Sequence, residues 1–412
     1  MADAADALAR TVREEWGRLV ALLLARFRRL DLVEDALADA VEAAARRWPE
    51  DGVPDRPAAW LHTSARRRVL DRLRAEAMAR RKEPLLVAES ELREHPAMAD
   101  PGDLVEDDVL RLVLMCTHPA LAPEAASALA LRLVLGVSTH DIARLFLVPE
   151  PTMAARLTRA KKRIVGAGIP FAVPDDDTLD DRLESVARTA YLAFTAGYAP
   201  GSGPDLLRAE LAGEAIRLTR LVDALRPGRP VLAALLALML LQHSRRDARV
   251  SAEGELVLLA DQDRARWRHD EIDEAVALLR DPRFAAPLSP QAASYLLQAR
   301  IAAEHATAPT AGETRWDRVV GLYDQLLAVT PGDAARLARA VAVAEADGPR
   351  AGLAALEDVG MPGSHRPSAV RAELLVRAGD PAAARDAFDE AIGLCRNEPE
   401  AAHLRARRAE LA

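Results

Sequence analysis

Five cations close the stretch GVSTHDIARLFLVPEPTMAARLTRAKKRI, residues 136–164. They are Arg156, Arg159, Lys161, Lys162 and Arg163, and no aspartate or glutamate occurs between Glu150 and Asp175. Guanidinium and ammonium groups clustered in this way bind phosphate oxygens. The alternative is a solvated basic face on an ordinary core helix, which is common. The chemistry that this cluster predicts is therefore binding of a polyanion such as a nucleic acid.

The same stretch has the pattern of a helix-turn-helix, in which the second helix enters the major groove of DNA. Ser138 is placed to cap the first helix, residues 138–146. LVPE predicts the turn, because Pro149 disfavours helix at the residue before it and Glu150 opens the second helix with favourable dipole charge. The residues predicted to face the core are Ile142, Ala143, Phe146, Met153, Leu157 and Ile164.

Composition sets the broad class of this 412-residue chain. Half of the residues are apolar and only 4% are aromatic, which favours helix over sheet. The two cysteines, Cys116 and Cys395, indicate neither a disulfide framework nor a metal site, and no cofactor is expected. The N-terminus lacks a signal pattern, and the longest apolar run, residues 231–241, is too short to span a bilayer. We therefore expect a soluble cytoplasmic protein without membrane contact.

The net charge of −8 is distributed unevenly. Residues 1–174 hold 26 basic and 26 acidic residues, whereas residues 175–412 hold 29 basic and 37 acidic ones. The neutral part contains the clustered basic helices. This asymmetry predicts nucleic-acid contact in the first part of the chain only.

The order of predicted elements gives an all-α fold with two small helical domains, an acidic linker and a large C-terminal helical domain. Helices are predicted at 6–30, 30–48 and 58–82, with Asp31 as a cap and a loop at 49–57. The acidic, proline-interrupted segment 83–108 is the linker, and helices resume at 109–117 and 123–135. The predicted domains are 1–82, 109–170 and 171–412, with GIPFAVPDDD (168–177) as a second tether.

The C-terminal domain is predicted to be helical throughout, with repeats near its end. Small and large residues alternate there, and a proline follows each helix pair, as in tetratricopeptide repeats of about 34 residues. The predicted helices are 178–199, 205–225, 230–245, 271–281, 289–306, 315–329, 333–346, 349–357, 366–378, 381–395 and 398–411.

Three motifs resemble sigma factors of the extracytoplasmic-function class in the sigma-70 family, in the right order and spacing. DLVEDALADAVEAAARRW resembles the region 2 helix that contacts the clamp of RNA polymerase. PAAWLHTSARRRVLDRLR resembles the minus-ten-element helix, and STHDIARLFLVPEPTMAARLTRAKKRI resembles region 4, which reads the minus-thirty-five element. DDVLRLVLMCTHPAL, GEAIRLTRLVDAL and LLADQDRARW resemble a subgroup with a long tetratricopeptide-like extension, often encoded beside a small DGPF-type protein.

The resemblance implies partners and contact residues. The partners are core RNA polymerase, promoter DNA and a regulatory protein or ligand at the C-terminal domain. The expected minus-thirty-five contacts are Ser138, Thr139, Glu150, Thr152, Arg156, Arg159, Lys162 and Arg163. The expected minus-ten contacts are Asp51, Arg56, Arg66, Arg67, Asp71 and Arg74. The expected clamp contacts are the acidic stripe Asp31, Glu34, Asp35 and Asp39, for which helix-dipole complementation is the alternative.

Other functions are less well supported by the residues. No Gly-rich phosphate loop, HExxH motif or nucleophile elbow occurs, so we expect no enzyme. The polar segments HSRRDAR (243–249) and ADQDRARW (260–267) are interpreted as an Arg–Asp network holding helices together, with a ligand pocket as the alternative. Trp60 is expected in the core rather than as a base-stacking platform. The rival class is a helix-turn-helix regulator with a repeat scaffold that does not bind polymerase.

Overall fold

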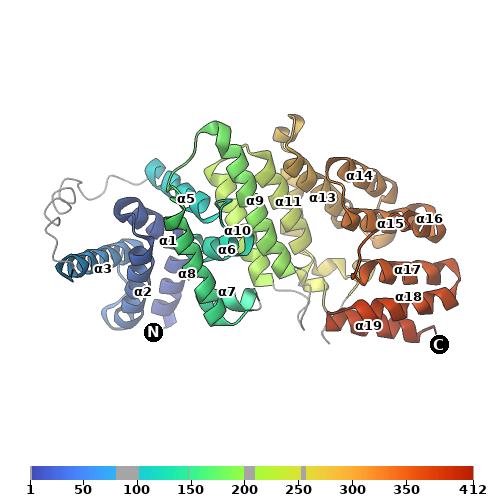
Figure 1. Cartoon of the computed structure of the whole chain (residues 1–412), viewed down its shortest axis with the longest axis horizontal. Coiled ribbons are helices and arrows are strands. Elements are labelled where there is room, and N and C mark those ends of the chain that lie inside the picture. The colour runs from blue at the N-terminus through green and yellow to red at the C-terminus, as the bar shows by residue number, and fades with distance from the viewer. Residues whose placement is uncertain (1, 80–101, 147, 199–208, 252–256, 412) are drawn as a thin grey trace. The chain divides into compact units, whose positions relative to one another are not determined.

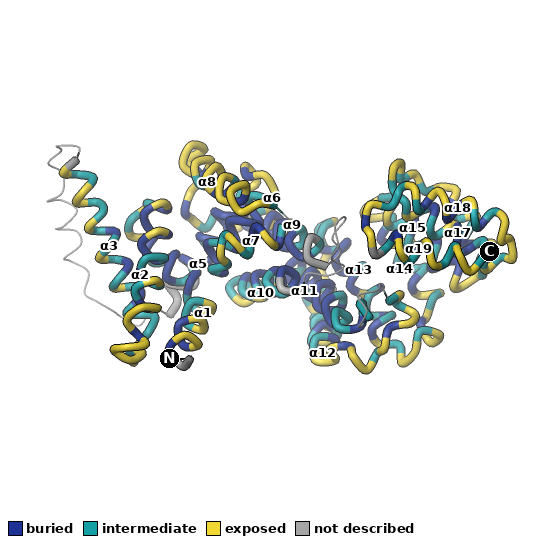
Figure 2. Tube along the Cα trace, turned by 90° about the horizontal axis from the view of Figure 1, so that it is seen from below, coloured by how far each residue is buried: buried dark blue, intermediate teal, exposed yellow. Residues whose placement is uncertain are grey.

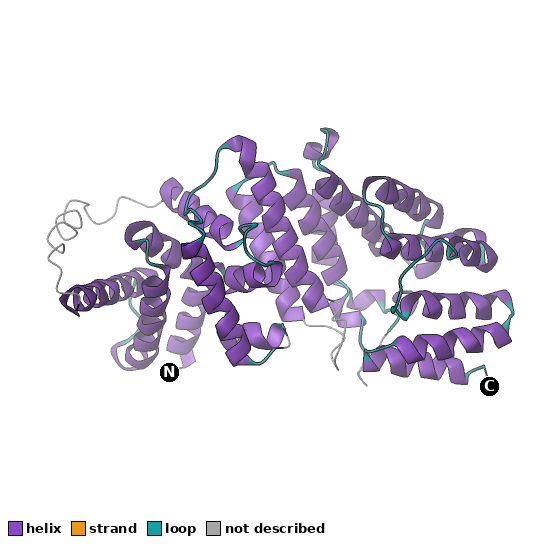
Figure 3. Ribbon diagram, in the orientation of Figure 1, coloured by secondary structure: helices purple, strands orange, loops and turns teal. Residues whose placement is uncertain are grey.

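The structure is a computed structural model that describes residues 2–79, 102–146, 148–198, 209–251 and 257–411. In these ranges every regular element is helical (Figure 3), so the all-α prediction is confirmed. The chain divides into two compact units, Met1–Thr189 and Ala190–Ala412. Among the described residues, no helix is both long and apolar enough to cross a membrane.

Three helices begin the first unit (Figure 1): α1 (Ala2–Phe27), α2 (Leu30–Asp51) and α3 (Pro57–Ala79). Their apolar residues at helical spacing meet in one core that includes Trp16, Leu23, Leu37 and Leu61. The loop between α2 and α3 is shorter than the predicted 49–57, because α2 continues through Pro49. A proline in a last turn removes one hydrogen bond, and Gly52, with φ +86°, ends the helix instead.

The next helices of this unit are α5 (Gly102–Cys116), α6 (Pro123–Leu129), the π-helix η1 (Ala130–Val134), α7 (Thr139–Leu145) and α8 (Glu150–Gly166). The predicted linker therefore ends too late, since helix begins at Gly102 rather than at residue 109. The acidic segment 83–101 lies outside the described residues. Helix α5 packs against α1, and its Leu110, Leu112 and Val113 are fully buried.

The predicted tether at 168–177 is packed rather than free. Ile169 and Phe171 are buried, and the Arg28 guanidinium lies 5.6 Å from the centre of the Phe171 ring. Helix α9 (Asp176–Tyr198) continues the first unit as far as Thr189. Arg182 donates to the Leu114 carbonyl at 2.5 Å, so the first turns of α9 belong with α5.

The second unit begins with the end of α9, α10 (Ala209–Leu225), α11 (Pro230–His243), α12 (His269–Leu278) and α13 (Pro290–Thr307). Short 3₁₀ turns lie at Arg246–Ala248, Leu259–Asp261, Arg264–Arg266, Pro282–Ala285 and Ala311–Glu313. The apolar run at 231–241 is buried all round, as α11 in Figure 2 shows. It packs against α10, α12 and α13.

The polar segments around α11 hold these helices together. Glu271 accepts from Arg246 at 2.9 Å and lies 3.0 Å from Nδ1 of His243. Arg264 donates to the carbonyls of His305, at 2.6 Å, and Ala308, at 2.9 Å. Asp247 of the predicted segment pairs with Arg268 at 2.7 Å, so the network contains an aspartate as well as the glutamate on α12. These bonds favour the structural interpretation.

Helix pairs complete the second unit: α14 (Trp316–Val329), α15 (Asp333–Asp347), α16 (Pro349–Ala355), α17 (Arg366–Ala378), α18 (Pro381–Leu394) and α19 (Glu398–Ala409). Each pair shares a small apolar cluster with its neighbour, such as Phe388 and Leu404 between α18 and α19. The helical C-terminal domain expected from the sequence is present, and its last part consists of successive packed helices.

Candidate nucleic-acid interface

Helices α7 and α8 form the predicted helix-turn-helix. The Ser138 hydroxyl accepts the Asp141 amide N–H at 3.0 Å, which confirms the predicted cap. The Val148 N–H donates to the Ala143 carbonyl at 3.0 Å and closes the turn. Ile142 and Ala143 are buried as expected, but Leu145 faces the core in place of the half-buried Phe146, because α7 ends at Leu145.

Helix α8 has an apolar and a basic face. Met153, Leu157 and Ile164 are buried as predicted, whereas most of the remaining surface is exposed (Figure 2). Arg159, Lys162 and Arg163 are exposed and Arg156 is half-buried. None of these four cations has a carboxylate partner within the described chain. Unpaired cations on an exposed helical face attract an anionic polymer, because their charge is not neutralised within the protein.

The polar residues at the start of the motif are also accessible. Thr152 is exposed on the first turn of α8, and Thr139 is half-buried at the start of α7. Glu150 is exposed and lies 3.1 Å from Nδ1 of His140. The beginning of α8 therefore carries the short polar side chains that a groove-reading helix uses.

The fifth cation of the run, Lys161, is different, because it contacts α2. Its Nζ lies 2.7 Å from the carboxylate of Glu34, and the Arg132 guanidinium on η1 lies 2.7 Å from the same carboxylate. The Glu34 side chain is only 7% exposed. Burial raises its pKa, but Lys161 and Arg132 outweigh that effect and hold the pKa below its ordinary value. Glu34 is therefore an ionised link between the first three helices and the helix-turn-helix.

Close backbone packing surrounds this link. Trp16 on α1 donates its indole N–H to the Arg132 carbonyl at 3.0 Å. A Cβ on Gly17 would lie 2.3 Å from the Val134 carbonyl oxygen, and one on Gly136, where φ is +74°, would lie 2.7 Å from the Trp16 ring. Glycine at both positions permits this close approach.

The other members of the acidic stripe remain on the surface of α2. Asp31, Asp35 and Asp39 have side-chain exposures of 64%, 67% and 43%. Asp31 pairs with Arg29 at 2.8 Å, whereas Asp35 and Asp39 share Arg72 of α3 at 3.6 and 2.7 Å. Asp31 does not cap α2, because Arg29 occupies the cap position. Side-chain hydrogen bonding to Arg29 lowers the pKa of Asp31.

A pocket of about 320 Å³ lies beside the short loop between α2 and α3. It is lined by Arg47, Trp48, Trp60 and residues 51–55. The two indole rings meet edge to face, with their centroids 5.8 Å apart. Trp60 is half-buried rather than a full core residue, and the buried Nε1 of Trp48 has no hydrogen-bond partner among the described residues. This pocket therefore offers two aromatic surfaces beside a loop that carries two carboxylates.

Basic side chains gather on the neighbouring part of α3. Arg66, His62 and Arg26 of α1 are close enough that burial, together with Arg66, lowers the pKa values of Arg26 and His62. The Nε of Arg66 is buried without a hydrogen-bond partner in the described chain. Arg56 and Arg67 are exposed. A cluster of like charges of this kind gains stability when it binds an anion.

The remaining expected residues near the pocket are Asp51, Asp71 and Arg74. Asp51 is exposed and lines the pocket, whereas Asp71 pairs with Arg74 at 3.3 Å on the surface of α3. Arg26, Trp48 and His62 also belong to this group, although they were not predicted from the sequence. Trp48 stands directly before the glycine- and proline-containing loop, which was a usable signal, but only folding brings α1 beside α3.

Three known protein families match successive parts of the chain. Residues 12–78 match the family described as sigma-70 region 2, and residues 111–164 match sigma-70 region 4. Residues 182–283 match a family of unknown function, DUF6596. An uncharacterized protein of Rhizobium meliloti (strain 1021) is 42% identical over 389 residues, which cover 93% of this chain and 90% of that protein.

Among solved structures, the crystal structure of yeast Tom70 is similar at a TM-score of 0.35 and 11% identity. The match covers 99% of this chain and 87% of that one.

Proposed function

The chain belongs to the sigma-70 family, as an extracytoplasmic-function type of sigma factor with a helical C-terminal extension, and from this premise we propose that it directs core RNA polymerase to specific promoters. The observation that carries the proposal is the pairing of two surfaces in the first unit. One is the basic face of α8, and the other is the aromatic pocket with the neighbouring cations of α3.

The proposed minus-thirty-five contact is the insertion of α8 into the major groove. Arg156, nearest the start of the helix, reads base edges, while Arg159, Lys162 and Arg163 bind phosphates. Ser138, Thr139, Glu150 and Thr152 position the motif at the groove entrance. The four unpaired cations support this role, because their charge is available to the DNA.

The proposed minus-ten contact captures an unstacked base in the pocket beside Trp48 and Trp60. A flipped base is held by stacking and by hydrogen bonds to its edge. The Trp48 and Trp60 rings supply stacking surfaces, and the carboxylates of Asp51 and Asp55 in the pocket wall supply acceptors. Arg66 and the exposed Arg56 and Arg67 bind the phosphates of the opened strand. Arg74 extends this basic surface along α3, and Asp71 positions it through their 3.3 Å pair.

The proposed polymerase contact is the exposed part of the acidic stripe, Asp31, Asp35 and Asp39. These carboxylates lie four residues apart on one face of α2, and each retains substantial exposure despite its arginine partner. A basic surface of polymerase can replace the arginine partners of these carboxylates. Glu34 becomes available for such a contact only when Lys161 and Arg132 leave it.

Promoter binding requires the first unit to open. The two promoter elements are about 25 base pairs apart, which at about 3.4 Å each is roughly 85 Å. A compact unit of 189 residues is roughly 40 Å across. Helices α2 and α8, joined through Glu34 and Lys161 at 2.7 Å, therefore separate before both elements are read. The closed arrangement is a resting state that polymerase and DNA replace.

The C-terminal helical domain is proposed to regulate this step. It carries the excess acid of the chain, 37 acidic against 29 basic residues beyond residue 174. Stacked helix pairs form extended surfaces that bind partners. Such a domain shifts the population of the open state if it binds one state better than the other.

Co-purification with core polymerase tests the proposed function. The full-length protein should co-elute with core enzyme in gel filtration and should support promoter-specific transcription in vitro. A conventional regulator instead binds palindromic half-sites as a dimer, independently of polymerase. Binding of duplex DNA as such a dimer, without co-elution, would contradict the proposal.

A further inference from the structure

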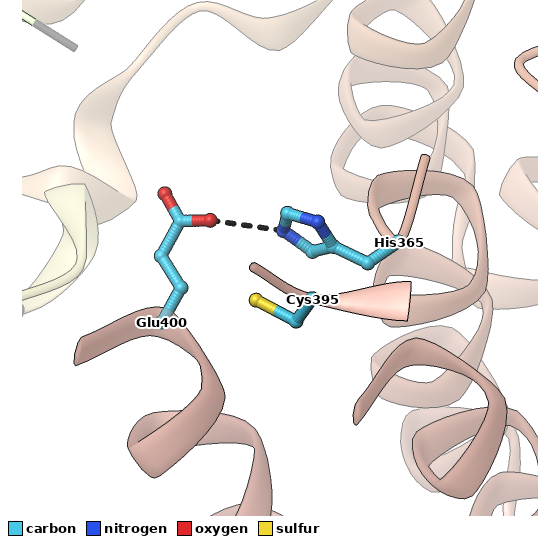
Figure 4. A group of neighbouring side chains, drawn as sticks. All are labelled: His365, Cys395 and Glu400. Carbon is cyan, nitrogen blue, oxygen red and sulfur yellow. Dashed lines mark ion pairs between the residues drawn. The ribbon is translucent and has the colours of Figure 1, made fainter. Parts of the chain in front are cut away.

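Three side chains with metal-binding atoms meet in the last helix pairs of the second unit. His365 is the cap residue of α17, Cys395 follows the end of α18, and Glu400 lies in the first turn of α19. Their ligand atoms all lie within 4.8 Å of one another (Figure 4). The Nε2 of His365 and a carboxylate oxygen of Glu400 are 2.9 Å apart. Only the packing of α17 to α19 brings them together, because His365 is remote from the other two in sequence.

The local structure holds these groups in place. Asn397 caps α19, because its side chain accepts the Glu400 N–H at 3.1 Å, and this residue is buried. The Cys395 thiol donates to the Asn397 carbonyl at 3.4 Å. Phe388 and Leu404 pack α18 against α19 directly behind this turn. The site is thus preorganised by a cap and a core contact, as ligand sites require.

The surroundings allow an ion to enter. His365 and Glu400 have side-chain exposures of 19% and 29%, and both line a pocket of about 400 Å³. Its other walls include Leu337, Val341 and His403. Cys395 is half-buried beside them, so none of the three donors is sealed in the core.

The donor set is typical of zinc. Imidazole nitrogen, thiolate sulfur and carboxylate oxygen are its usual ligands, at about 2.0–2.3 Å. At a tetrahedral angle these bond lengths separate the ligand atoms by roughly 3.3–3.6 Å. The observed limit of 4.8 Å requires a movement of about 1 Å, which side-chain rotation provides. The two anionic ligands also balance the charge of a divalent cation.

We propose that His365, Cys395 and Glu400 form a binding site for Zn²⁺ or a similar divalent transition metal. The three residues leave one coordination position open toward the pocket, as in exchangeable rather than closed structural sites. Binding replaces the His365–Glu400 ion pair and the thiol hydrogen bond with metal–ligand bonds. The Cys395 thiol loses its proton to solvent as the sulfur–metal bond forms, and neither the metal nor the sulfur changes oxidation state. The ion ties α19 to α17 and to the end of α18.

Cobalt spectroscopy on the reduced, metal-stripped full-length protein tests the site. We expect one Co²⁺ per chain, with the near-ultraviolet charge-transfer absorption of a thiolate ligand, and displacement by Zn²⁺. Cys395→Ser should abolish that absorption, whereas Glu398→Gln, which changes an exposed carboxylate paired with Arg405 on the same helix, should leave it unchanged. The other cysteine, Cys116, is fully buried, and burial raises the pKa of its thiol, so it contributes no thiolate.

A second measurement covers the case in which Cys395→Ser fails to fold. Zn²⁺ should raise the melting temperature of the parent and of Glu398→Gln, because a ligand of the folded state stabilises it. His365→Ala and Glu400→Gln should each bind Zn²⁺ at least about tenfold more weakly, since even outer-shell changes have such effects. A parent spectrum without thiolate absorption, or Zn²⁺ affinity equal to the parent's in both variants, would overturn the proposal.

Discussion

The carboxylate of Glu34 lies 2.7 Å from the Nζ of Lys161, so one ion pair joins the helix that carries the acidic stripe to the helix that carries the basic face. Glu34 is buried and Lys161 is half-buried, and Arg132 completes the contact from η1 at 2.7 Å. The two surfaces proposed for polymerase and for DNA are therefore coupled through a single side chain. Changes at Glu34 should affect both.

Replacement of Glu34 by Gln should favour the open state. The substitution leaves Lys161 and Arg132 partly buried without their anion. Breaking a fully buried pair costs about 3–5 kcal/mol, and the cost here is smaller because both cations keep some exposure. Fluorescent labels on α3 and α8 should report a larger separation than in the parent. Glu42→Gln is the matched control, because that exposed carboxylate on α2 pairs with the exposed Arg46. Identical separations in both variants would show that Glu34 does not hold the closed state.

The same contact should weaken in acid. The pKa of Glu34 is held below its ordinary value in the closed state, so the ionised form stabilises closure. This stabilisation is complete above the ordinary pKa of about 4.3 and is lost as the pH falls through the lower value of the closed state. The label separation should therefore increase at acid pH in the parent and should depend less on pH in Glu34→Gln. An equal response in both proteins would assign the change to other groups.

Truncation of the basic face should weaken binding to a minus-thirty-five duplex. Arg156→Ala should cost about 1–3 kcal/mol and relax base preference, whereas Arg159→Ala should weaken all sequences alike and reduce the salt dependence. Anisotropy titrations at several salt concentrations measure both effects. Arg46→Ala, which removes an exposed arginine of α2, is the control. Parent-like binding by both α8 variants would exclude this helix as the reading helix.

Charge reversal on α2 should prevent holoenzyme assembly. Asp35→Arg with Asp39→Arg removes the carboxylates proposed for polymerase, but it also breaks their pairs with Arg72. Adding Arg72→Glu restores opposite charges between α2 and α3 without restoring the acidic stripe. Both the double and the triple variant should fail to co-elute with core enzyme. If the triple variant assembled with core enzyme, Asp35 and Asp39 would stabilise the fold through Arg72 and would not contact polymerase.

Removal of the C-terminal domain should change promoter output several-fold, provided that the cut preserves the first unit. Leu179, Leu183 and Val186 on α9 are buried, and each contributes about 1.5–3 kcal/mol when fully buried. A fragment ending at residue 198 should therefore melt at a higher temperature than one ending at residue 174. Reporter transcription at matched expression gives the sign of regulation. Equal output from residues 1–198 and the full chain would mean that the extension has no regulatory role at that promoter.

The sequence by itself determined which segments are helical and which face of each is apolar. The spacing of Met153, Leu157 and Ile164 predicted the buried side of α8, and the cations followed on the other sides. Ser138 and Pro149 marked the turn for local reasons, since capping and proline geometry act within a few residues. Such local rules explain why the predicted helix bounds in the repeats agree closely with the structure.

Only the tertiary structure decided which partner each polar side chain meets. Glu34 lies within the apolar stripe of α2, between Leu30 and Leu37, and that position was a usable signal of burial. Nothing in the spacing identified Lys161, which is 127 residues away, as its partner. Cys395 and Glu400 likewise gave no metal-type pattern, because His365 reaches them only through the packing of α17. Helical periodicity shows how a residue is oriented on its own helix, but long-range packing determines what it touches.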